Sequence, residues 1–517
     1  MITRPKDADA IVKRLLPMVN STSGETAEVF SPLDGAVVCN IPISSSQDVT
    51  DAFATASKAF ENWRETNLTT RINYVNKFHD LLLQNSAEIL DIVQWENGKT
   101  RACGNDEILD IAQTCRYYAN TASRFLKSKK RRGAFPVVTV VEEVHHPLGV
   151  VGVISPWNYP LTLAVSDFIP ALIAGNAVVI KPDLQTPLSA LVLIELLFKA
   201  GVPREVIQVV MGEGAVVGPQ IVERADFVMF TGSTRVGREV AQQAGARLIP
   251  ASMELGGKNS LVIDKNVEIK TAVELAVRGA YANSGQLCIG TERIVVHADI
   301  YEEFLPAFCN AVKNMKLGSS IGWGFDMGTL INEKQIQTAE NHIQDAVTKG
   351  AKVEVGGKRR SDIGPFVFEP TVISGVKPDA TICHTETFGP VCSVYKWSND
   401  EELVAFVNNT DYGLSAGIVS NNISWANKIA HRLHVGAVNI NEAFASAYVS
   451  IDAPMGGMKQ SGLGRRHGES GILKYTESQT IARQRWMKLG PQWNMTDEGW
   501  SNLASKAVKL LKVLRIK

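Results

Sequence analysis

The sequence predicts an α/β protein built on a doubly wound parallel sheet, and the pattern after Gly149 carries this prediction. Apolar runs typical of strands occur there at residues 150–154, 177–180, 206–210 and 227–230, and helical stretches separate them. Strands that alternate with helices form parallel sheets, because each connection crosses one face of the sheet. At 517 residues the chain exceeds what one hydrophobic core supports, so we expect two or three domains.

The segments that follow these four strands are polar or rich in glycine. They read Ser-Pro-Trp-Asn at 155–158, Lys-Pro-Asp at 181–183, Gly-Glu-Gly at 212–214 and Thr-Gly-Ser at 231–233. Ligands of doubly wound sheets bind at the carboxyl ends of the strands. The four segments therefore predict one cofactor-binding edge.

The other segments complete the predicted order. Residues 47–127 carry amphipathic helical stripes, the basic run 127–133 predicts a solvated loop, and the β-branched run 137–144 predicts a strand. Residues 258–468 repeat the α/β texture and predict a second domain that closes over the edge of the first.

The tail beyond Trp486 predicts a basic amphipathic helix. Its apolar face consists of Trp500, Leu503, Ala504, Ala507, Val508, Leu511 and Leu514. Its basic residues are Lys506, Lys509, Lys512, Arg515 and Lys517. Such a helix docks on the protein body or a neighbouring subunit, or it lies on an anionic membrane surface as a peripheral contact through residues 500–517.

Composition narrows the function classes. Lys plus Arg and Asp plus Glu both number 53, so net charge gives no reason to expect nucleic acid as a partner. The seven cysteines are scattered and odd in number, which favours reduced thiols and a cytoplasmic location over a disulfide or zinc framework. The pair His145-His146 has no third ligand nearby, so we expect no metal. Neither a secretory signal nor an apolar run long enough to span a bilayer is visible.

Residues 281–293, Y-A-N-S-G-Q-L-C-I-G-T-E-R, contain the strongest candidate for chemistry. A helical pattern leads into this stretch and breaks at the turn residues Asn283-Ser284-Gly285, so Cys288 falls on a loop before a strand-like run. A cysteine on such a loop can meet a substrate. By itself the window leaves two interpretations open, a nucleophile or a small buried hydrophobic residue.

Two further segments are candidates for the same site. In Met253 to Asn259, Glu254 precedes Gly256-Gly257, and glycines let other groups approach closely, although this pattern is also common in solvated turns. The segment Thr231-Gly232-Ser233 opens a helix and predicts a phosphate cradle. Its spacing, glycine at 232 and 237, is not the usual Rossmann fingerprint.

Together these segments resemble the aldehyde dehydrogenase superfamily, over about residues 25 to 485. The matching stretches are S-P-W-N-Y-P (155–160), A-G-N-A-V-V-I-K-P (174–182), F-T-G-S-T-R-V-G (230–237), M-E-L-G-G-K-N (253–259), N-S-G-Q-L-C (283–288), E-T-F-G-P (386–390) and P-M-G-G-M-K-Q-S-G-L-G-R (454–465). Among the groups of this superfamily, the chain looks most like the bacterial succinate-semialdehyde dehydrogenases.

The resemblance implies a fold and a division of the chain. Residues 1–129 and 148–256 would form a Rossmann-like dinucleotide-binding domain, and residues 257–468 an α/β catalytic domain. Segments 130–147 and 469–490 would form a small β flap that joins subunits into a homodimer or homotetramer. Residues 491–517 would be the basic amphipathic tail.

The resemblance also implies a mechanism. Cys288 would attack the aldehyde carbonyl, and the side-chain amide of Asn158 with the N–H of Cys288 would hold the oxyanion. Hydride transfer to a nicotinamide would leave a thioester, and Glu254 would deprotonate the water that hydrolyses it. The cofactor-binding residues implied are Ser155, Pro156, Trp157, Lys181, Asp183, Leu184, Gly212, Phe230, Gly232, Ser233, Val236, Leu255, Gly256, Glu386 and Phe388.

Two departures from the family pattern carry predictions. Many NAD-preferring relatives have Glu where this chain has Leu184, so we expect NADP to be favoured, with some NAD activity because Asp183 is close. Where relatives often carry Lys and Glu as an ion pair, this chain has Asp167 and Arg466. We therefore predict a reversed ion pair between them.

The substrate is less sharply defined. Members that oxidise succinate semialdehyde hold its carboxylate with two arginines, and Ser166 and Ala282 stand at those positions here. The pocket residues implied are Tyr159, Leu163, Leu287, Ile289, Phe444 and Tyr448, which are mostly apolar. Succinate semialdehyde and a medium-chain aliphatic or aromatic aldehyde both remain candidates. Two other classes stay open: a non-catalytic structural relative and a cofactor-independent thiol esterase.

Overall fold

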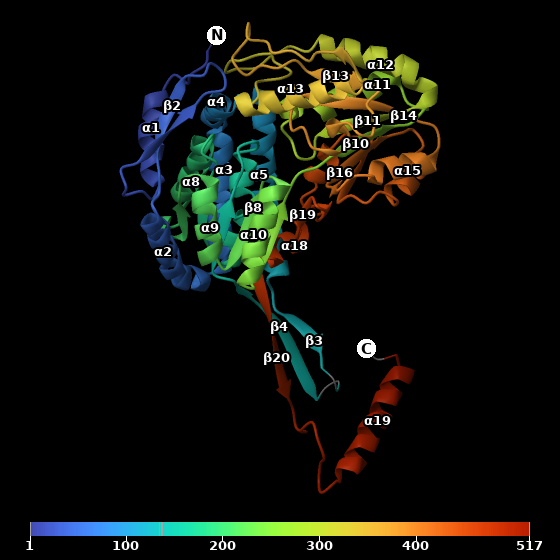
Figure 1. Cartoon of the computed structure of the whole chain (residues 1–517). Helices are drawn as coiled ribbons and strands as arrows, with labels where there is room; N and C mark the ends of the chain where they lie inside the picture. The colour runs from blue at the N-terminus through green and yellow to red at the C-terminus, as the bar shows by residue number, and fades with distance from the viewer. Residues whose placement is uncertain (1, 134, 136–137, 516–517) are drawn as a thin grey trace.

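The computed structural model describes residues 2–133, 135 and 138–515. It consists of two α/β bodies side by side, with a narrow β stalk and a separate C-terminal helix below them (Figure 1). Val137, where the strand of residues 137–144 was predicted to begin, and Lys517 in the predicted tail lie outside the described residues.

The N-terminal part is mainly helical, as predicted for residues 47–127. Its elements are α1 (Ala8–Leu15), η1 (Leu16–Met18), β1 (Thr26–Phe30), β2 (Val37–Pro42), α2 (Ser46–Glu65), α3 (Leu68–Gln84), α4 (Ser86–Asn97) and α5 (Arg101–Phe125). Ser45 and Asp48 form a reciprocal capping box that begins α2. Gly98 ends α4 with φ 76°, a conformation that favours glycine.

The first body contains the doubly wound sheet that the sequence predicts. Its strand order is β19-β9-β8-β5-β6-β7, and all pairs are parallel except β19 with β9. The strands are β5 (Val150–Ile154), β6 (Ala177–Lys181), β7 (Ile207–Val209), β8 (Phe227–Thr231), β9 (Ala251–Glu254) and β19 (Gly462–Leu463). The connections contain α6 (Thr162–Val165), α7 (Ile169–Ala174), α8 (Pro187–Ala200), η2 (Arg204–Val206), α9 (Gly214–Arg224) and α10 (Thr234–Ala246).

The second body contains a seven-stranded sheet with the order β12-β13-β14-β11-β10-β16-β17, antiparallel only between β12 and β13. Its strands are β10 (Asn259–Ile263), β11 (Thr291–His297), β12 (Lys352–Val355), β13 (Thr371–Ser374), β14 (Val391–Trp397), β16 (Ser415–Val419) and β17 (Ala437–Ile440). Its helices are α11 (Ile269–Tyr281), η3 (Ala282–Gly285), α12 (Ala298–Lys313), α13 (Glu333–Thr348), α14 (Thr381–His384), α15 (Asp400–Asn408), α16 (Ile423–Ala430) and α17 (Ala445–Tyr448). A two-stranded ribbon of β15 (Tyr412–Gly413) and β18 (Met458–Lys459) adjoins them.

The stalk is an antiparallel sheet in the order β20-β4-β3, from β3 (Lys129–Arg132), β4 (Thr139–Pro147) and β20 (Thr476–Gln484). Helix α18 (Gly468–Leu473) leads into β20. The solvated loop predicted for residues 127–133 is wrong, because Lys129–Arg132 pair with Val140–Glu143 of β4. The backbone of Lys129–Arg132 is hydrogen-bonded to β4, and the side chains of this strand are mostly exposed. Charged side chains on an edge strand oppose aggregation.

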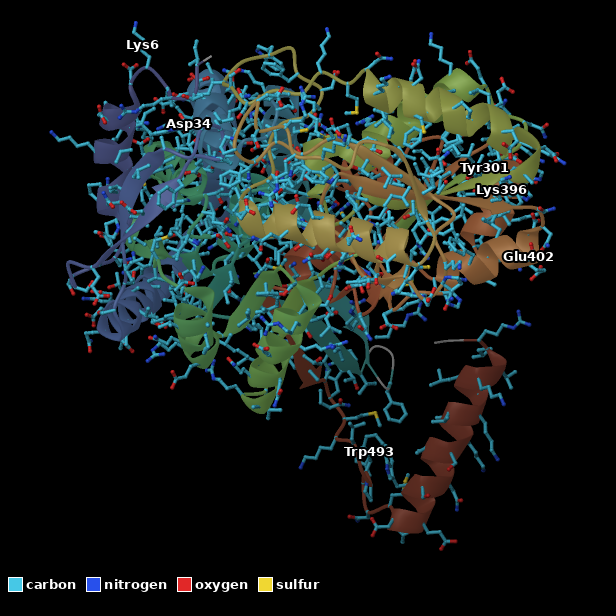
Figure 2. The ribbon with its side chains drawn as sticks, turned by 45° about the horizontal axis from the view of Figure 1, so that its top comes forward. Lys6, Asp34, Tyr301, Lys396, Glu402 and Trp493 are labelled. Atoms are coloured by element: carbon cyan, nitrogen blue, oxygen red, sulfur yellow. The ribbon has the colours of Figure 1, made fainter. Side chains whose placement is uncertain are left out.

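The predicted C-terminal helix is confirmed as α19 (Asp497–Val513). None of its residues is buried, and it stands apart from both bodies (Figure 1). Trp493, in the segment before α19, is 86% exposed and projects from the chain (Figure 2). Among the described residues, no helix is long and apolar enough to cross a membrane.

Candidate active site

Cys288 lies in a tightly held loop between α11 and β11. Asn283 and Ser284 turn the chain in left-handed conformations at φ 51° and 56°. The amide of Asn259 donates to the carbonyl oxygens of Cys288, at 2.7 Å, and Gly290, at 2.8 Å. Gly257 must be glycine, because a Cβ there would lie 2.5 Å from the Cys288 carbonyl oxygen. These contacts fix the backbone of the cysteine.

Two cavities meet at Cys288. One has a volume of about 130 Å³ and the other about 340 Å³. Four residues line both, namely Asn158, Thr231, Glu254 and Cys288. Because Cys288 is only partly buried, its thiol can meet one molecule from each side. The three predicted catalytic residues are therefore brought together from segments 34 to 130 residues apart, since β5, β9 and the loop before β11 end at the same place.

Asn158 is held on its backbone and its side chain. Its carbonyl oxygen accepts from Lys99 Nζ at 2.8 Å and from Asn283 Nδ2 at 3.0 Å. Its own Nδ2 donates to the carbonyl oxygen of Gln286 at 3.1 Å. An amide nitrogen has two hydrogens, so the second can serve a ligand in the cavities that Asn158 lines.

Glu254 ends β9 and is buried, and its Oε1 has no hydrogen-bond partner among the described residues. Burial raises the pKa of this carboxyl to about 7, against the opposing charges of Arg466 and Lys474. A carboxyl that titrates near neutrality can take up and release a proton under cellular conditions. This is the property that a general base needs.

The surroundings of Cys288 oppose ionisation of its thiol. Burial raises its pKa to about 12, and the charges of Glu386 and Glu254 add to the effect. A thiolate therefore forms only when a base takes the proton or when a positive charge arrives beside the sulfur. The raised pKa of Cys288 could not be predicted from the sequence, because it depends on burial and on two acids that are distant in the chain.

The larger cavity contains many of the predicted cofactor residues. Those that line it are Pro156, Trp157, Gly232, Ser233, Leu255, Gly256, Glu386 and Phe388. The others lie at the ends of β6 and β8, in the segments after β5, β6 and β7, or in the first turn of α10, namely Ser155, Lys181, Asp183, Leu184, Gly212, Phe230 and Val236. Sequence reasoning missed Lys334, Gln335 and Thr338, which reach the cavity from α13. No short motif marks these helix residues.

A buried ion pair shapes this cavity. Lys258 pairs with Glu292, and the carboxylate of Glu292 accepts from the N–H groups of Thr387 and Phe388. Glu386 in turn accepts from the N–H of Gly257 at 2.8 Å. Burial, with the nearby charge of Glu292, raises the pKa of Glu386 to about 8. The loop that carries Glu386 and Phe388 is thereby fixed to the strand ends beside Cys288.

The cavity fits a dinucleotide. Helix α10 begins at Ser233, whose Oγ accepts from the N–H of Val236, and the N-terminus of a helix favours phosphate. A Cβ at Gly256 would lie 2.6 Å from Glu386 Oε2, so glycine there leaves Glu386 its place on the cavity wall. Burial lowers the pKa of the Lys181 ammonium at the end of β6, against the charges of Asp183 and Glu213.

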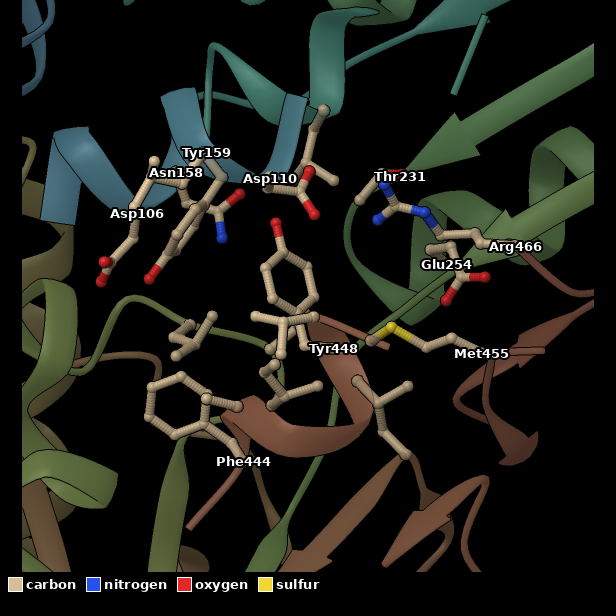
Figure 3. Close-up of a pocket in the computed structure, with 18 of the residues that line it drawn as sticks. Asp106, Asp110, Asn158, Tyr159, Thr231, Glu254, Phe444, Tyr448, Met455 and Arg466 are labelled. Atoms are coloured by element: carbon tan, nitrogen blue, oxygen red, sulfur yellow. The ribbon is translucent and has the colours of Figure 1, made fainter. Parts of the chain in front are cut away.

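The smaller cavity is lined by all six predicted pocket residues, Tyr159, Leu163, Leu287, Ile289, Phe444 and Tyr448. Helix α5 adds Asp106, Leu109, Asp110 and Gln113, and the wall also contains Arg278, Met455 and Arg466. Figure 3 shows Tyr448 pointing its hydroxyl towards Asp110 across the pocket. The α5 residues escaped the sequence analysis because they lie some 180 residues before Cys288 on an ordinary amphipathic helix.

The predicted reversed ion pair is confirmed. Arg466 Nε lies 2.9 Å from Asp167 Oδ1, and their side chains are 5% and 3% exposed. Arg466 also lines the smaller cavity together with Glu254 (Figure 3). Its positive charge lowers the pKa of Glu254, so the pair belongs to the electrostatic setting of the site.

A cysteine, a carboxyl and an amide lie between two joined cavities. This arrangement is typical of enzymes that use a cysteine as nucleophile. Residues 18–481 match the model of the aldehyde dehydrogenase family. The chain belongs to this family.

Relatives and solved structures agree. The chain is 45% identical over 473 residues, 92% of this chain and 91% of the relative, to "Putative succinate-semialdehyde dehydrogenase [NADP(+)] 2" of Mycobacterium bovis. It is 42% identical over 511 residues, 99% of both chains, to "Putative succinate-semialdehyde dehydrogenase [NADP(+)]" of Mycolicibacterium smegmatis. The crystal structure of succinate-semialdehyde dehydrogenase from Burkholderia pseudomallei superposes with a TM-score of 0.86 at 34% identity, covering 90% of this chain and 95% of that one.

The buried ion pair predicts a charge-reversal effect. Asp167→Lys should lower the free energy of unfolding by about 3–5 kcal/mol, because it buries a second cation beside Arg466. The double variant Asp167→Lys/Arg466→Glu restores an ion pair with the opposite orientation and should recover most of this loss. Urea unfolding of the single variants Asp167→Lys and Arg466→Glu and of the double variant measures the effect. The prediction is contradicted if the double variant loses as much free energy of unfolding as the two single variants together.

Proposed function

We propose that the protein oxidises an aldehyde to a carboxylic acid with NADP or NAD as the acceptor. The observation that carries the proposal is the meeting of Cys288, Glu254 and Asn158 where two cavities join. One cavity has the features of a dinucleotide site and the other is a mostly apolar pocket, so an aldehyde and a nicotinamide can reach the same sulfur from opposite sides.

The chain's own residues supply the steps at sulfur and water. The thiol of Cys288 loses its proton to water, and its sulfur bonds to the aldehyde carbon as the C=O π electron pair moves to the oxygen. The resulting oxyanion accepts from the Asn158 amide and the Cys288 N–H. The bound nicotinamide supplies an acceptor for the hydride that leaves this carbon. Glu254 then takes a proton from water as the water oxygen attacks the thioester carbon, and the Cys288 sulfur departs with the carboxylic acid released.

The high pKa of Cys288 suits this order of events. A cation beside a thiol lowers its pKa, so the thiol stays protonated until an oxidised nicotinamide is held against Trp157, Glu386 and Phe388. Lys181 would contact the adenosine ribose, and Ser233 with the first turn of α10 would bind the pyrophosphate. The cysteine is thereby protected from reaction until the cofactor is bound.

We propose succinate semialdehyde as the substrate, supported by the names of the relatives at 42–45% identity. A second candidate, a medium-chain aliphatic or aromatic aldehyde, is favoured by the apolar wall and by Ser166 and Ala282, where arginines would hold a carboxylate. Initial rates of reduced-nicotinamide formation with both aldehyde classes distinguish the two candidates. Absence of any cofactor reduction would favour a structural relative or a thiol esterase instead.

We propose that the domains follow the division at residues 129, 147, 256, 468 and 490, and that the stalk joins subunits into a homodimer or homotetramer. The exposed strand β20 of the stalk supports this, because its outer edge can pair with another chain. We also propose a cytoplasmic location, supported by seven cysteines that are all unpaired.

The basic helix α19 is the proposed site of peripheral contact with an anionic membrane. Leu503, Val508 and Leu514 are exposed along its apolar face, and its lysines are free to meet lipid phosphates. Docking on a second subunit is the competing outcome, because α19 follows the stalk in the chain.

Cys288→Ser is expected to lose dehydrogenase activity, since a hydroxyl is a far weaker nucleophile than a thiol at neutral pH. Glu254→Gln should form the thioester once and then stall, because no base remains to activate water. A stopped-flow burst of reduced cofactor without steady turnover identifies the second variant. Full turnover by either variant would overturn the proposed mechanism.

The pKa of Glu254 predicts the pH dependence of thioester hydrolysis. The base is active when ionised, so the hydrolysis rate should rise as pH increases through about 7 and then level off. The raised pKa also destabilises the folded state as pH rises from about 4.5 to 7, since the unfolded chain ionises more readily there. Single-turnover rates at several pH values test the profile, with Glu254→Gln as the flat control.

Leu184→Glu should shift cofactor preference from NADP to NAD. A carboxylate at this position repels a 2′-phosphate and accepts from the ribose hydroxyls of NAD. We expect kcat/KM with NADP to fall at least tenfold, about 1.4 kcal/mol in transition-state binding, while the value with NAD rises. Leu184→Gln, which lacks the charge, is the matched control. A strong preference of the wild-type enzyme for NAD would contradict the predicted preference for NADP.

Truncation after Met495 should abolish co-sedimentation with vesicles rich in phosphatidylglycerol and leave aldehyde oxidation unchanged. Replacement of Lys506, Lys509 and Lys512 by Gln should weaken binding in the same way and make it independent of salt. Unchanged sedimentation after truncation discards the membrane contact. A fall in oligomer mass on sizing would identify α19 as a subunit contact instead.

A further inference from the structure

A buried polar turn between α4 and α5 lies behind Asn158, and the proposed chemistry leaves it without a role. Glu96 and Asn97 at the end of α4 and Lys99 in the turn are all buried. Burial of charged or polar side chains destabilises a fold unless they have hydrogen-bond or ionic partners. The partners of these three side chains therefore show which segments the turn contacts. Glu96 accepts from the N–H groups of Leu188 and Ser189 at the start of α8 and thereby anchors the turn to the first body.

The side chain of Lys99 joins a carboxylate to the backbone of Asn158. Its Nζ donates to Glu107 Oε1 at 2.6 Å and to the Asn158 carbonyl oxygen at 2.8 Å. The ammonium also lies 4.1 Å from the ring centre of Tyr159. Both charged side chains are fully buried, at 0% exposure. The ammonium therefore links Glu107 of α5 to the segment that carries Asn158 and Tyr159.

Glu107 holds the other end of the same segment. Its Oε2 accepts from the N–H groups of Leu161, at 2.9 Å, and Thr162, at 3.0 Å. Residues 158–162 are thus held at one end by the lysine and at the other by the carboxylate that pairs with it. Asn97 adds a third contact, because its Nδ2 donates to the carbonyl oxygen of Trp157 at 2.8 Å.

The direction of Lys99 is itself forced. Gly98 has φ 76°, and a Cβ there would lie 1.9 Å from Thr329 Oγ1 in the second body. The Gly98 carbonyl oxygen accepts from the N–H of Thr329 at 3.1 Å. The backbone from which Lys99 extends towards Asn158 is therefore fixed against both bodies.

We propose that Lys99, anchored by Glu107, is a positioning residue that sets the amide of Asn158 for the developing oxyanion. The inference rests on the proposed role of Asn158. An oxyanion donor stabilises charge only when it is preset at hydrogen-bond distance from the place where the charge develops. A shift of about 1 Å in such a group can cost about 100-fold in rate. Lys99 therefore acts on the formation and collapse of the tetrahedral intermediate and touches neither substrate nor cofactor.

The test separates positioning from folding. Lys99→Met alone leaves the Glu107 carboxylate buried without its cation, so it should lower the melting temperature. Lys99→Met/Glu107→Gln removes both charges and should recover the melting temperature while kcat stays roughly 10- to 100-fold below wild type. The dissociation constant for NADP, measured by fluorescence titration, should change less than about twofold. Glu107→Gln alone, which keeps the lysine but loosens it, should lower kcat by a smaller factor.

A double-mutant cycle with Asn158→Ala identifies the route. If Lys99 acts through Asn158, adding Lys99→Met/Glu107→Gln to Asn158→Ala should lower kcat no further. Arg71→Met is the matched control, because Arg71 is a buried cation that donates to backbone carbonyl oxygens of Ile173 and Thr66, and it should lower stability without lowering kcat.

The outcomes distinguish the two proposals. Penalties that add in the cycle, or a wild-type kcat in Lys99→Met/Glu107→Gln while Asn158→Ala is impaired, would overturn the positioning role alone. Full activity of Asn158→Ala would overturn the role of Asn158 and with it the proposed mechanism.

Discussion

The ion pair of Lys258 and Glu292 is the contact on which the arrangement at Cys288 depends. Lys258 lies just before β10, Glu292 lies in β11, and the carboxylate also holds the loop of residues 386–388 through two backbone N–H groups. A buried carboxylate is stable only with such partners, so the pair joins three segments that lie 34 and 95 residues apart in the chain. The cavity wall beside the cysteine follows from this contact.

Burial of charge is also what gives the site its chemistry. Cys288, Glu254 and Glu386 all have raised pKa values, because the junction of the two bodies excludes water from three ionisable groups at once. Arg466 and Lys474 limit the effect at Glu254, so this carboxyl titrates near neutrality and remains usable as a base. The same burial thus raises the pKa of the thiol and of the carboxyl that we propose to act after it.

Much of the fold could be predicted from the sequence because the strands of the first body are continuous apolar runs followed by polar turns. Continuous apolar runs are typical of strands in a parallel sheet that helices cover on both faces. The basic run 127–133 was misassigned because a charged edge strand lacks this signal, and its strand conformation depends on pairing with Val140–Glu143 of β4. The reversed pair of Asp167 and Arg466 was predictable only because both partners departed together from a known pattern.

The sequence alone determined the alternation of strands and helices, the polar strand ends and the identity of the cysteine, carboxyl and amide, since these depend on local pattern and motif. Tertiary structure alone decided which distant side chains complete the site: Asp110 from α5, Gln335 from α13, and Lys99 behind Asn158. The physical reason is that burial and hydrogen bonding act through space. The role of a residue on an ordinary helix depends on the side chains that pack against it. Its neighbours in the sequence do not indicate which side chains these are.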